Sequence, residues 1–384
     1  MLLFKNITYI DQNFTIKQGD ILVKDGYIQD IQSNIPEDNK RVLRFENYLA
    51  APGLIDIHIH GCMGCDTMDA THASLETITA FTASKGVTTL LPTTMTDTPI
   101  RIQRALKAVA SFIDRPGRGS LIAGVHIEGP FINELYRGAH NRAYIRPPTT
   151  DEVDAMADII GMHHISMTMA PEIEGGAMVM EHALGKGFRL SLGHTGADYN
   201  MTMSAAKQGI LSITHIFNGM KPLHHRDPSV AGAAMTGPFY VELIADGVHS
   251  HPAMVDMVIR LKGTDKTILV TDAMMATGLS DGQYQLGGQR VYVKDGIARL
   301  KEGNLAGSTL TLIQAVKNVV KFTGLPPGQA LKMASLTPAV ALGIDNITGS
   351  ISVGKRADII LLNSNLDPVL TMVAGNIVFS CRPL

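Results

Sequence analysis

The sequence is poor in cysteine, in aromatic residues and in excess charge, and each shortage excludes a class of protein. Its 384 residues include only three cysteines, Cys62, Cys65 and Cys381, which is too few for a disulfide-held scaffold. Tryptophan is absent and aromatic residues make up 5%, which argues against a stacking platform for sugar polymers. With 33 basic against 35 acidic residues the net charge is −2, too balanced for general affinity toward nucleic acids or anionic membranes.

Long apolar runs are also missing. No stretch approaches the roughly 18 residues of a membrane-spanning helix. The first 20 residues, MLLFKNITYIDQNFTIKQGD, alternate as strands do and lack the cationic flank and continuous apolar run of a signal peptide. We therefore expect a cytoplasmic protein. A composition of 45% apolar and 18% charged residues is typical of a globular chain with one large or two moderate domains.

Both ends of the chain resemble strands of a small domain. Near the start, LVKDGYI predicts a hairpin, because Asp25 and Gly26 tolerate the positive φ angles of a tight turn. From Gly349 onward, SISVGKRADIILLN and VLTMVAGNIVFS each contain an apolar strand. Neither end is large enough to bury a core alone. We therefore predict that residues 1–50 and 346–384 form one small β-sandwich domain beside a larger domain at 51–345.

The larger domain repeats a short apolar run followed by a segment with helical spacing. The runs expected to form strands are 54–59, 88–91, 121–127, 165–170, 188–192, 211–216, 241–245 and 267–271. Helical segments such as 71–85, 99–113 and 151–162 lie between them. This alternation predicts an α/β fold with a parallel sheet, and eight repeats fit a (β/α)₈ barrel of the TIM type. A doubly wound open sheet is the alternative, but no glycine-rich fingerprint follows an early strand.

The region after the eighth strand breaks this alternation. Residues 284–300 predict a second hairpin, with its turn at Asp295 and Gly296. A long helix that begins near Ser308 is then expected to complete the barrel pattern.

Histidines and carboxylates recur at the ends of the predicted strands. Asp56, His58 and His60 share one face of the first strand, because side chains alternate along a strand. The other residues of this kind are His126 and Glu128 after strand three, His194 after strand five, His215 after strand six and Asp272 after strand eight. The carboxyl ends of barrel strands converge on one mouth. Burying His58, His60, His194 and His215 together with Glu128 and Asp272 is costly unless a divalent cation pairs them, so the sequence predicts a metal site.

This constellation resembles the amidohydrolase superfamily, whose members carry His-x-His after strand one, ligands from the middle strands and an Asp after strand eight. Within it, the chain is similar along nearly its whole length to the N-acetylglucosamine-6-phosphate deacetylase family. The similar segments are PGLIDIHIHG, HIEGPF followed by RGAHN, SLGHT, THIFNGM, ADGVH and VTDAM. The resemblance implies a metal-dependent hydrolase of amino-sugar metabolism, which converts N-acetyl-D-glucosamine 6-phosphate to D-glucosamine 6-phosphate and acetate.

The resemblance also implies a set of metal ligands. Glu128, His194 and His215 would hold the principal ion, and His58 and His60, with Glu128 as a bridge, would hold a second. Glu128 stands where many relatives use a carbamylated lysine. Zinc is the default from the ligand types, and iron(II) or manganese would tolerate the same set. The sequence leaves open whether one or two ions bind.

Further roles follow from the same resemblance. Asp272 would shuttle a proton from the attacking water to the departing amine, and His140 would hydrogen-bond the scissile carbonyl. The residues implied for the sugar phosphate are Asn218, Gly219, Arg226 and His249, together with His140. In some relatives the arginine reaches the phosphate from a neighbouring subunit, so a homodimer is expected.

Several alternatives stay open at this point. The same fold and metal would serve a cyclic amide, an N-acyl amino acid or an amino-purine, and the galacto epimer of the phosphosugar differs at one hydroxyl only. A barrel kept as a scaffold without catalysis is a further alternative, although every ligand position is filled. We interpret His126 as a residue that supports the ligands. Cys62 and Cys65 are interpreted as small buried thiols rather than a redox or metal pair.

Overall fold

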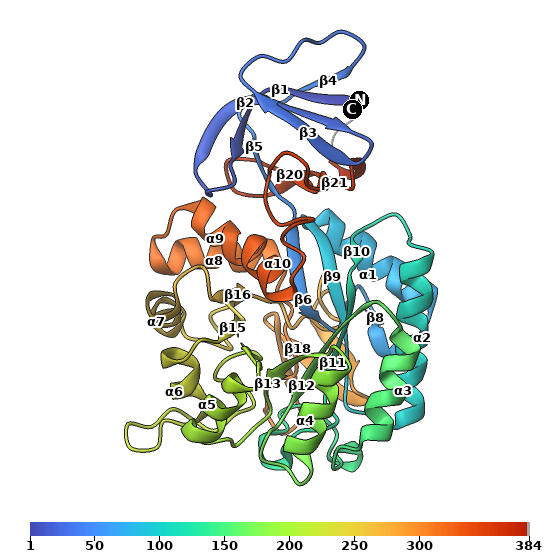
Figure 1. Cartoon of the computed structure of the whole chain (residues 1–384), viewed down its shortest axis with the longest axis vertical. Helices are drawn as coiled ribbons and strands as arrows, with labels where there is room; N and C mark the ends of the chain where they lie inside the picture. Colours follow the sequence, from blue (N-terminus) through green and yellow to red (C-terminus); the bar gives the residue numbers. More distant parts are fainter. Residues whose placement is uncertain (382–384) are drawn as a thin grey trace.

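The computed structural model describes residues 1–381 and has two parts (Figure 1). A small sheet built from both ends of the chain lies at one end of a larger barrel of strands and helices. The predicted fold class, a (β/α)₈ barrel with a small β domain formed by both termini, is confirmed. The boundaries at 50/51 and 345/346 stay a prediction. None of the described helices is long and apolar enough to cross a membrane.

The barrel strands are all parallel, and their order in space follows their order along the chain. They are β6 (Leu54–Ile59), β9 (Val87–Thr94), β10 (Leu121–Ile122) with β11 (Gly124–Glu128), β12 (His164–Met169), β13 (Arg189–Leu192), β14 (Ser212–Ile213), β15 (Tyr240–Leu243) and β16 (Thr267–Leu269). Ile59 bridges Ala273, and the N–H of Asp272 donates to the carbonyl of His58 over 2.9 Å. These contacts join the eighth strand to the first at their carboxyl ends. Each of the eight predicted runs contains a strand.

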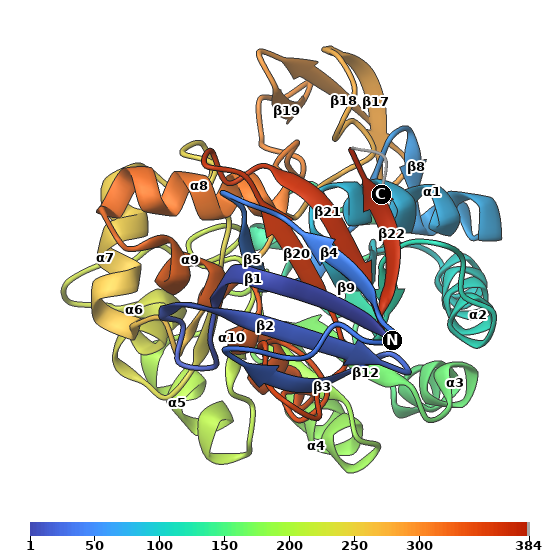
Figure 2. The ribbon, with the colours of Figure 1, turned by 90° about the horizontal axis from the view of Figure 1, so that it is seen from above.

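Helices pack around the outside of these strands (Figure 2). They are α1 (His72–Ser84), α2 (Pro99–Asp114), α3 (Thr150–Ile160), α4 (Gly176–Gly185), α5 (Tyr199–Lys207), α6 (Ser229–Thr236) and α7 (Pro252–Lys262), with the 3₁₀ turns η1 (Thr67–Asp69), η2 (Glu134–Tyr136) and η3 (Arg142–Tyr144). The first three helices begin where a threonine hydroxyl accepts a backbone N–H from the first turn: Thr71, Thr98 and Thr149. The segments 71–85, 99–113 and 151–162 are therefore helical as predicted, with ends shifted by one or two residues.

The segment after β16 differs from the prediction in one respect. The Asp295-Gly296 turn is present, in a three-stranded antiparallel sheet of β17 (Gly282–Leu286), β18 (Gln289–Lys294) and β19 (Ile297–Leu300) that projects beside the barrel (Figure 2). The expected start of a long helix near Ser308 is wrong. Ser308 continues as extended chain, because its N–H and Oγ bind the carbonyls of Asp272 and Thr271. Three helices follow instead: α8 (Leu312–Thr323), α9 (Pro327–Met333) and α10 (Leu336–Leu342).

The terminal sheet runs in the order β22-β21-β20-β5-β1-β2-β3, with β4 paired to β1. Its strands are β1 (Leu2–Ile10), β2 (Ile16–Lys24), β3 (Tyr27–Gln32), β4 (Arg41–Arg44), β5 (Leu49–Pro52), β20 (Ile359–Leu362), β21 (Pro368–Val373) and β22 (Asn376–Ser380). β1 pairs with β4 along its first half and with β5 along its second, and it changes partner around Asn6, which has a φ of 50°. The two halves can therefore enclose a core that includes Phe4 and Ile359.

The terminal sheet lies against the amino ends of the barrel strands, since β6 starts directly after β5 (Figure 1). Thr371 Oγ1 donates to the carbonyl of Ala83 over 2.7 Å, and Arg356 Nη2 donates to Thr89 Oγ1 over 2.8 Å. The carboxyl ends of the strands consequently form the mouth of the barrel at the opposite end, where the polar residues of the sequence were expected to meet.

Candidate active site

A cavity of about 310 Å³ opens at the mouth of the barrel. Its lining includes nine residues that the sequence singled out: His60, Glu128, His140, His194, His215, Asn218, Gly219, His249 and Asp272. His58 is fully buried next to this lining, with its Nε2 atom 3.5 Å from Glu128 Oε1. The structure thus brings the five expected metal ligands, Asp272 and His140 to one place.

Three of these residues have unusual backbone angles at the point where a strand ends. The φ angles are 48° for His194, 24° for His215 and 48° for Asp272. Positive φ is uncommon for residues other than glycine, and such strain costs on the order of 1–3 kcal/mol per residue. All three side chains line the cavity from these strained positions. The strain is therefore concentrated where the strand ends present their polar groups.

Glu128, at the end of β11, occupies the centre of the imidazole cluster. Its Oε1 atom lies 3.0 Å from His194 Nε2 and 2.9 Å from His215 Nε2. Its Oε2 atom faces His60 Nε2 at 3.2 Å. Both carboxylate oxygens are thus shared among rings from the first, fifth and sixth strands, which suits a residue that bridges two cation subsites.

Asp272 faces the same cluster from the other side. Its Oδ1 atom is 3.2 Å from His60 Nε2 and 3.7 Å from His58 Nε2. Burial alone would raise the pKa of this carboxyl, but His60 and His58 outweigh burial and lower the pKa to about 2. Asp272 is therefore ionised at neutral pH and ready to accept a proton.

The partners of the Nδ1 atoms show how two of the rings are oriented. His60 Nδ1 contacts the backbone carbonyl of Thr93 at 3.2 Å, and His194 Nδ1 contacts the carbonyl of Tyr136 at 2.8 Å. A carbonyl oxygen only accepts hydrogen bonds, so each Nδ1 carries the hydrogen. The Nε2 lone pairs of the neutral rings then face Glu128, as metal ligands require.

His140 has the opposite arrangement. Its Nδ1 atom accepts the backbone N–H of Thr96 over 3.3 Å, so in the neutral ring the hydrogen sits on Nε2. That Nε2 lies 3.4 Å from Glu128 Oε2 and 3.3 Å from His194 Nε2. His140 therefore presents a hydrogen-bond donor to the cavity, whereas His60 and His194 present lone pairs.

The charges of the cluster match a divalent cation. Burial opposes the charged form of each group, yet the carboxylates of Glu128 and Glu242 hold the pKa of His58 well above its ordinary value. Asp272 and Glu128 likewise raise the pKa of His60 to about 9. His58 Nε2 is also a buried atom without a hydrogen-bond partner among the described residues. Two groups at this site, His58 with His60 and Glu128, and Glu128 with His140 and His194, each have ligand atoms within 4.8 Å of one another and could hold a divalent cation once the rings lose their extra protons.

Comparison with known proteins places this geometry in a family. The model of the Amidohydrolase family matches residues 49–378. The chain belongs to this family. A curated relative from Vibrio furnissii, named N-acetylglucosamine-6-phosphate deacetylase, is 42% identical over 85% of this chain and 82% of its own length.

Two further proteins are similar to this amidohydrolase along nearly its whole length. An N-acetylgalactosamine-6-phosphate deacetylase from Escherichia coli O157:H7 is 35% identical over 93% of this chain and 97% of its own length. The crystal structure of an N-acetylglucosamine-6-phosphate deacetylase from Thermotoga maritima superimposes with a TM-score of 0.90 at 36% identity, over 99% of this chain and 100% of that one. The whole architecture, including the terminal sheet, is thus shared with that structure.

The residues expected to hold a sugar phosphate divide into two groups. Asn218, Gly219 and His249 line the cavity. Gly219 has a φ of 56°, and a Cβ atom there would lie only 2.6 Å from His194 Nδ1, so this turn needs glycine. His249 Nδ1 lies 2.6 Å from Asp246 Oδ2, which leaves its Nε2 atom for a ligand.

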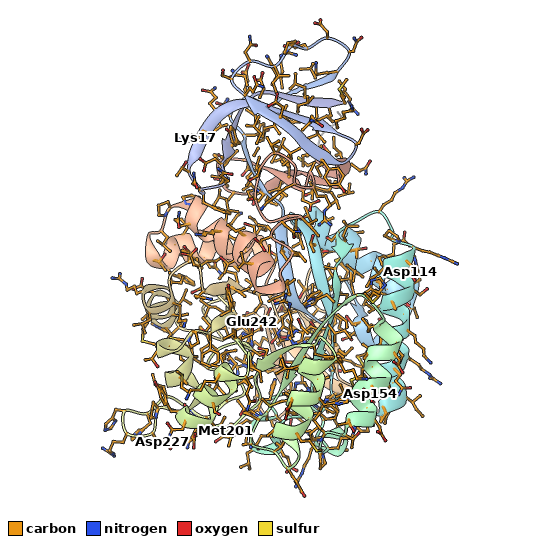
Figure 3. All side chains as sticks on the ribbon, in the orientation of Figure 1. Lys17, Asp114, Asp154, Met201, Asp227 and Glu242 are labelled. Carbon is orange, nitrogen blue, oxygen red and sulfur yellow. The ribbon has the colours of Figure 1, made fainter. Side chains whose placement is uncertain are left out.

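Arg226 is not brought to the cavity within the described part of the chain. It is exposed on a loop between α5 and α6, where its Nη1 atom contacts the neighbouring His225 over 2.7 Å. Figure 3 shows the next residue, Asp227, at the outer edge of the molecule, at the end away from the terminal sheet. A role for Arg226 at the cavity of this amidohydrolase therefore stays a prediction.

Two features of the site were not found from the sequence. Glu242, in the middle of β15, is buried beside His58, and a lone acidic residue in the apolar run YVEL was the available signal. The wall of the cavity also includes Leu286 of β17 and the 304–307 segment after β19. Nothing in the sequence of that hairpin indicated which way it would fold.

His126 lies where a residue that supports the ligands would lie, and Cys62 is buried as expected, whereas Cys65 is only half-buried. His126 contacts the carbonyl of Ile57 at 3.2 Å and Thr168 Oγ1 at 2.7 Å, outside the cavity lining. Cys62 and Cys65 lie on the two strands of a short hairpin, β7 (Gly61–Cys62) and β8 (Cys65–Asp66). Both are free thiols, and burial raises the pKa of Cys62 above its ordinary value.

Proposed function

We propose that this amidohydrolase removes the acetyl group of N-acetyl-D-glucosamine 6-phosphate and releases D-glucosamine 6-phosphate and acetate. The observation that carries the proposal is the pairing at one cation site of an ionised Asp272 with His140, whose Nε2 atom carries a hydrogen. Amide hydrolysis needs one group that accepts a proton and one that polarises the carbonyl. The relatives named as deacetylases of amino-sugar phosphates supply the substrate class.

The residues present fit one cation firmly and leave room for a second. Glu128, His194 and His215 would hold the principal ion, and His58, His60 and Glu128 would hold the other. We propose zinc as the ion, and iron(II) or manganese suits the same donors. When bound, a cation of this kind acidifies water and polarises carbonyl oxygens.

His140 and Asp272 then have different roles in the hydrolysis of the amide bond. His140 donates a hydrogen bond from Nε2 to the acetyl oxygen, and this strengthens as negative charge develops there. Asp272 accepts the proton that the attacking water loses and transfers it to the amine nitrogen as the C–N bond breaks. The balance is one water consumed, and one amine and one acetate released.

The phosphosugar is held at the rim of the cavity. Asn218 and the Gly219 backbone face the phosphate in this proposal, and His249 contacts the sugar or phosphate. In this proposal Arg226 approaches from a neighbouring subunit, because in its own chain Arg226 is exposed and is not part of the cavity lining. We accordingly propose a cytoplasmic homodimer.

Acetate release tests the substrate directly. N-Acetyl-D-glucosamine 6-phosphate is expected to be hydrolysed much faster than unphosphorylated N-acetyl-D-glucosamine, and chelator-treated protein serves as the control. Equal kcat/KM for the two sugars would overturn the phosphosugar assignment. The galacto 6-phosphate belongs in the same experiment, since a relative is named for that epimer. A faster rate on it would move the proposal to the galacto substrate.

A further inference from the structure

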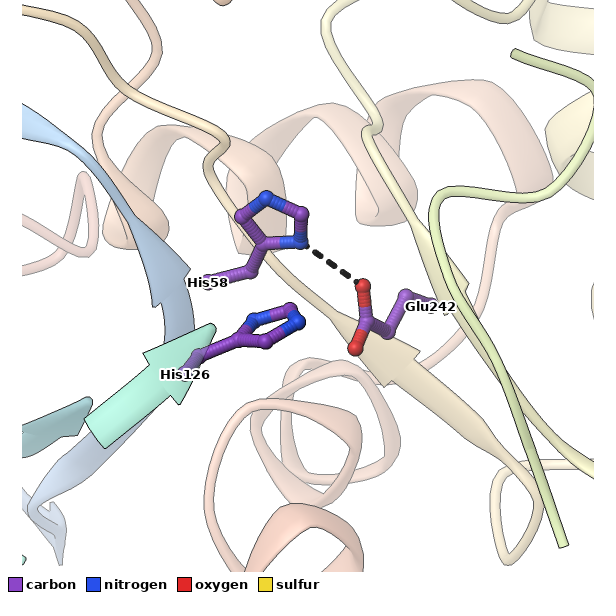
Figure 4. A group of neighbouring side chains, drawn as sticks. All are labelled: His58, His126 and Glu242. Atoms are coloured by element: carbon purple, nitrogen blue, oxygen red, sulfur yellow. Dashed lines mark hydrogen bonds and ion pairs between the residues drawn. The ribbon is translucent and has the colours of Figure 1, made fainter. Parts of the chain in front are cut away.

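A carboxylate that the proposed mechanism does not use lies directly beneath the site. Glu242 belongs to β15, the seventh barrel strand, and is 4% exposed. Its side chain points toward His58 of the first strand, where Glu242 Oε2 lies 3.0 Å from His58 Nδ1 (Figure 4). The same oxygen accepts the backbone N–H of His215 over 3.3 Å. One carboxylate thus contacts two of the expected metal ligands from below.

His126 completes this group but does not compete for a cation. Its ring lies 4.5 Å from the ring of His58 and beside Glu242 (Figure 4). His126 Nδ1 contacts the carbonyl of Ile57, and its Nε2 contacts Thr168 Oγ1. Both nitrogens are therefore occupied. The group of His58, His126 and Glu242 is a support beneath the cavity rather than a metal site of its own.

The contact with Glu242 decides which nitrogen of His58 faces the cavity. An ionised carboxylate only accepts hydrogen bonds, so His58 Nδ1 carries the hydrogen. The Nε2 atom is left toward Glu128 Oε1 at 3.5 Å and Asp272 Oδ1 at 3.7 Å. The corresponding anchors of His60 and His194 are backbone carbonyls, which no side-chain substitution removes. The anchor of His58 is a charged side chain, and a carboxylate acceptor also makes the ring a stronger ligand.

We propose that Glu242 is a positioning residue that orients His58 as an Nε2 ligand and so sets the affinity of the His58, His60 and Glu128 subsite for its divalent cation. The inference deepens the proposed function, on which its catalytic meaning rests. If this is so, the two cation subsites differ in how strongly their affinity depends on Glu242. The ion held by His194 and His215 depends on Glu242 only through the longer contact with the backbone N–H of His215, whereas the ion held by His58 depends on the contact that orients the ligand ring itself.

Metal binding by two variants tests this inference. Glu242→Leu removes the acceptor, and Glu242→Gln retains an oxygen of the same reach without the charge. Zn²⁺ bound per chain is measured against a graded series of competing chelators. We expect Glu242→Leu to weaken one class of Zn²⁺ about 10- to 100-fold, the size of effect typical for such outer partners, while the affinity of the other class changes much less. Glu242→Gln is expected to fall between the wild type and Glu242→Leu.

A spectroscopic measurement on the wild-type chain needs no variant to fold. In zinc-loaded protein with ¹⁵N-labelled histidine, His58 is expected to show a protonated Nδ1 and a metal-bound Nε2. Glu242→Gln should retain the Nδ1–H signal. A His58 ring with a bare Nδ1, or a folded Glu242→Leu with wild-type Zn²⁺ affinity, would overturn the proposal.

Asp20→Asn provides the matched control. Asp20 is also a buried carboxylate that accepts several hydrogen bonds, but it lies in the terminal sheet. This variant is expected to lose thermal stability but to keep wild-type affinity for both classes of Zn²⁺. It therefore separates the general effect of losing a buried carboxylate from the specific effect of losing the residue that orients His58. Failure of the proposed function would differ, because the wild type would then release no acetate even with both classes of Zn²⁺ bound.

Discussion

At the residue scale, the second nitrogen of each imidazole decides what the ring can do at the site. His60 and His194 donate from Nδ1 to carbonyl oxygens, so their Nε2 lone pairs face the cavity. His140 accepts a backbone N–H at Nδ1 and offers a donor instead. In the proposed mechanism the same side chain type thus serves as ligand or as carbonyl polariser, and the backbone around it makes the distinction.

The assignment of Asp272 as proton shuttle gives the first prediction. Asp272→Asn keeps the size and one oxygen of the side chain but removes the base, so the proton of the attacking water has no acceptor. We expect kcat for acetate release to fall by at least about 10²–10⁴-fold, the contribution typical of a positioned acid–base group. Metal content per chain, measured by elemental analysis, should stay near the wild-type value. Wild-type turnover in a metal-replete variant would remove Asp272 from this role.

Cation binding should displace protons from the histidines. In the metal-free protein the carboxylates of Asp272 and Glu128 raise the pKa of His60 to about 9, against the effect of burial, so the ring is charged at pH 7. A ligand must be neutral, and binding therefore releases a proton. Zn²⁺ affinity is expected to rise with pH up to about 9 and to fall by as much as tenfold per pH unit below it for each displaced proton.

Calorimetry in two buffers of different ionisation enthalpy measures that release. At pH 7 we expect at least one proton per bound Zn²⁺, seen as a difference in apparent enthalpy between the buffers. Identical enthalpies together with an affinity that stays flat from pH 6 to 9 would show that the free histidines are neutral.

The sequence predicted the residues that line the site better than the residues and carbonyl groups that orient them from outside the cavity. His58, His60, Glu128, His194 and Asp272 were found because alternation along strands and the convergence of barrel strand ends are regular. Which nitrogen of a ring carries the hydrogen depends on carbonyls from distant loops, and periodicity contains no information on these contacts. Glu242 lay inside an apolar run, where a single acidic residue is a weak signal until its partner across the barrel is known.

At the scale of elements, regular strands were predicted well and the connections between them were not. β6 occupies the predicted residues 54–59, whereas the helix expected near Ser308 starts at Leu312. Ser308 is held in extended form by backbone atoms of the eighth strand end, a contact between segments 36 residues apart that no local pattern records. The position of the β17–β19 sheet at the cavity is likewise set by contacts between distant segments, which local sequence patterns do not record.

Asp20 gives a pH-dependent prediction for the terminal sheet. Its carboxylate accepts the N–H groups of Asn6 and Ile35 and the ammonium of Lys5, each over 2.7 Å. Burial raises the pKa of Asp20, but these donors outweigh burial and hold the pKa below its ordinary value. A carboxyl with a lowered pKa stabilises the fold above its unfolded pKa of about 3.9, and this contribution is lost as pH falls through the folded value.

We therefore expect Asp20→Asn to cost about 1–3 kcal/mol of stability at pH 7, since it disturbs charge-assisted hydrogen bonds at a buried site. Thermal melting of both proteins from pH 7 down to pH 3 measures the effect. The gap in Tm should narrow below about pH 4, because the unfolded wild-type chain takes up a proton at Asp20 there, whereas the folded carboxyl with its lowered pKa resists protonation. A gap that is constant across this range would mean that the charge of Asp20 contributes nothing.

At the scale of the whole molecule, the terminal sheet and the mouth of the barrel lie at opposite ends. The terminal sheet covers the amino ends of the barrel strands through contacts such as Arg356 with Thr89, and the mouth stays open at the other end. The open end also carries the loop with Arg226 at its outer edge. Arg226 is not part of the cavity lining of its own chain. The phosphate contact proposed for Arg226 is therefore made only if a second chain supplies this side chain.

This requirement yields a prediction about the assembled protein. Arg226→Ala alone should chiefly raise KM for the phosphosugar, because a guanidinium that pairs with phosphate in the bound substrate is lost.

Mixing this variant with Asp272→Asn then distinguishes the origin of the arginine. In a twofold dimer with Arg226 acting across subunits, a mixed dimer has one site with intact Asp272 and a partner's arginine, and one site with both defects. After random reassociation, about one quarter of all sites are of wild-type composition, so the mixture should recover roughly a quarter of the wild-type rate at the wild-type KM. An arginine that acted within its own chain would give no recovery, and the mixture would show only the high KM of Arg226→Ala.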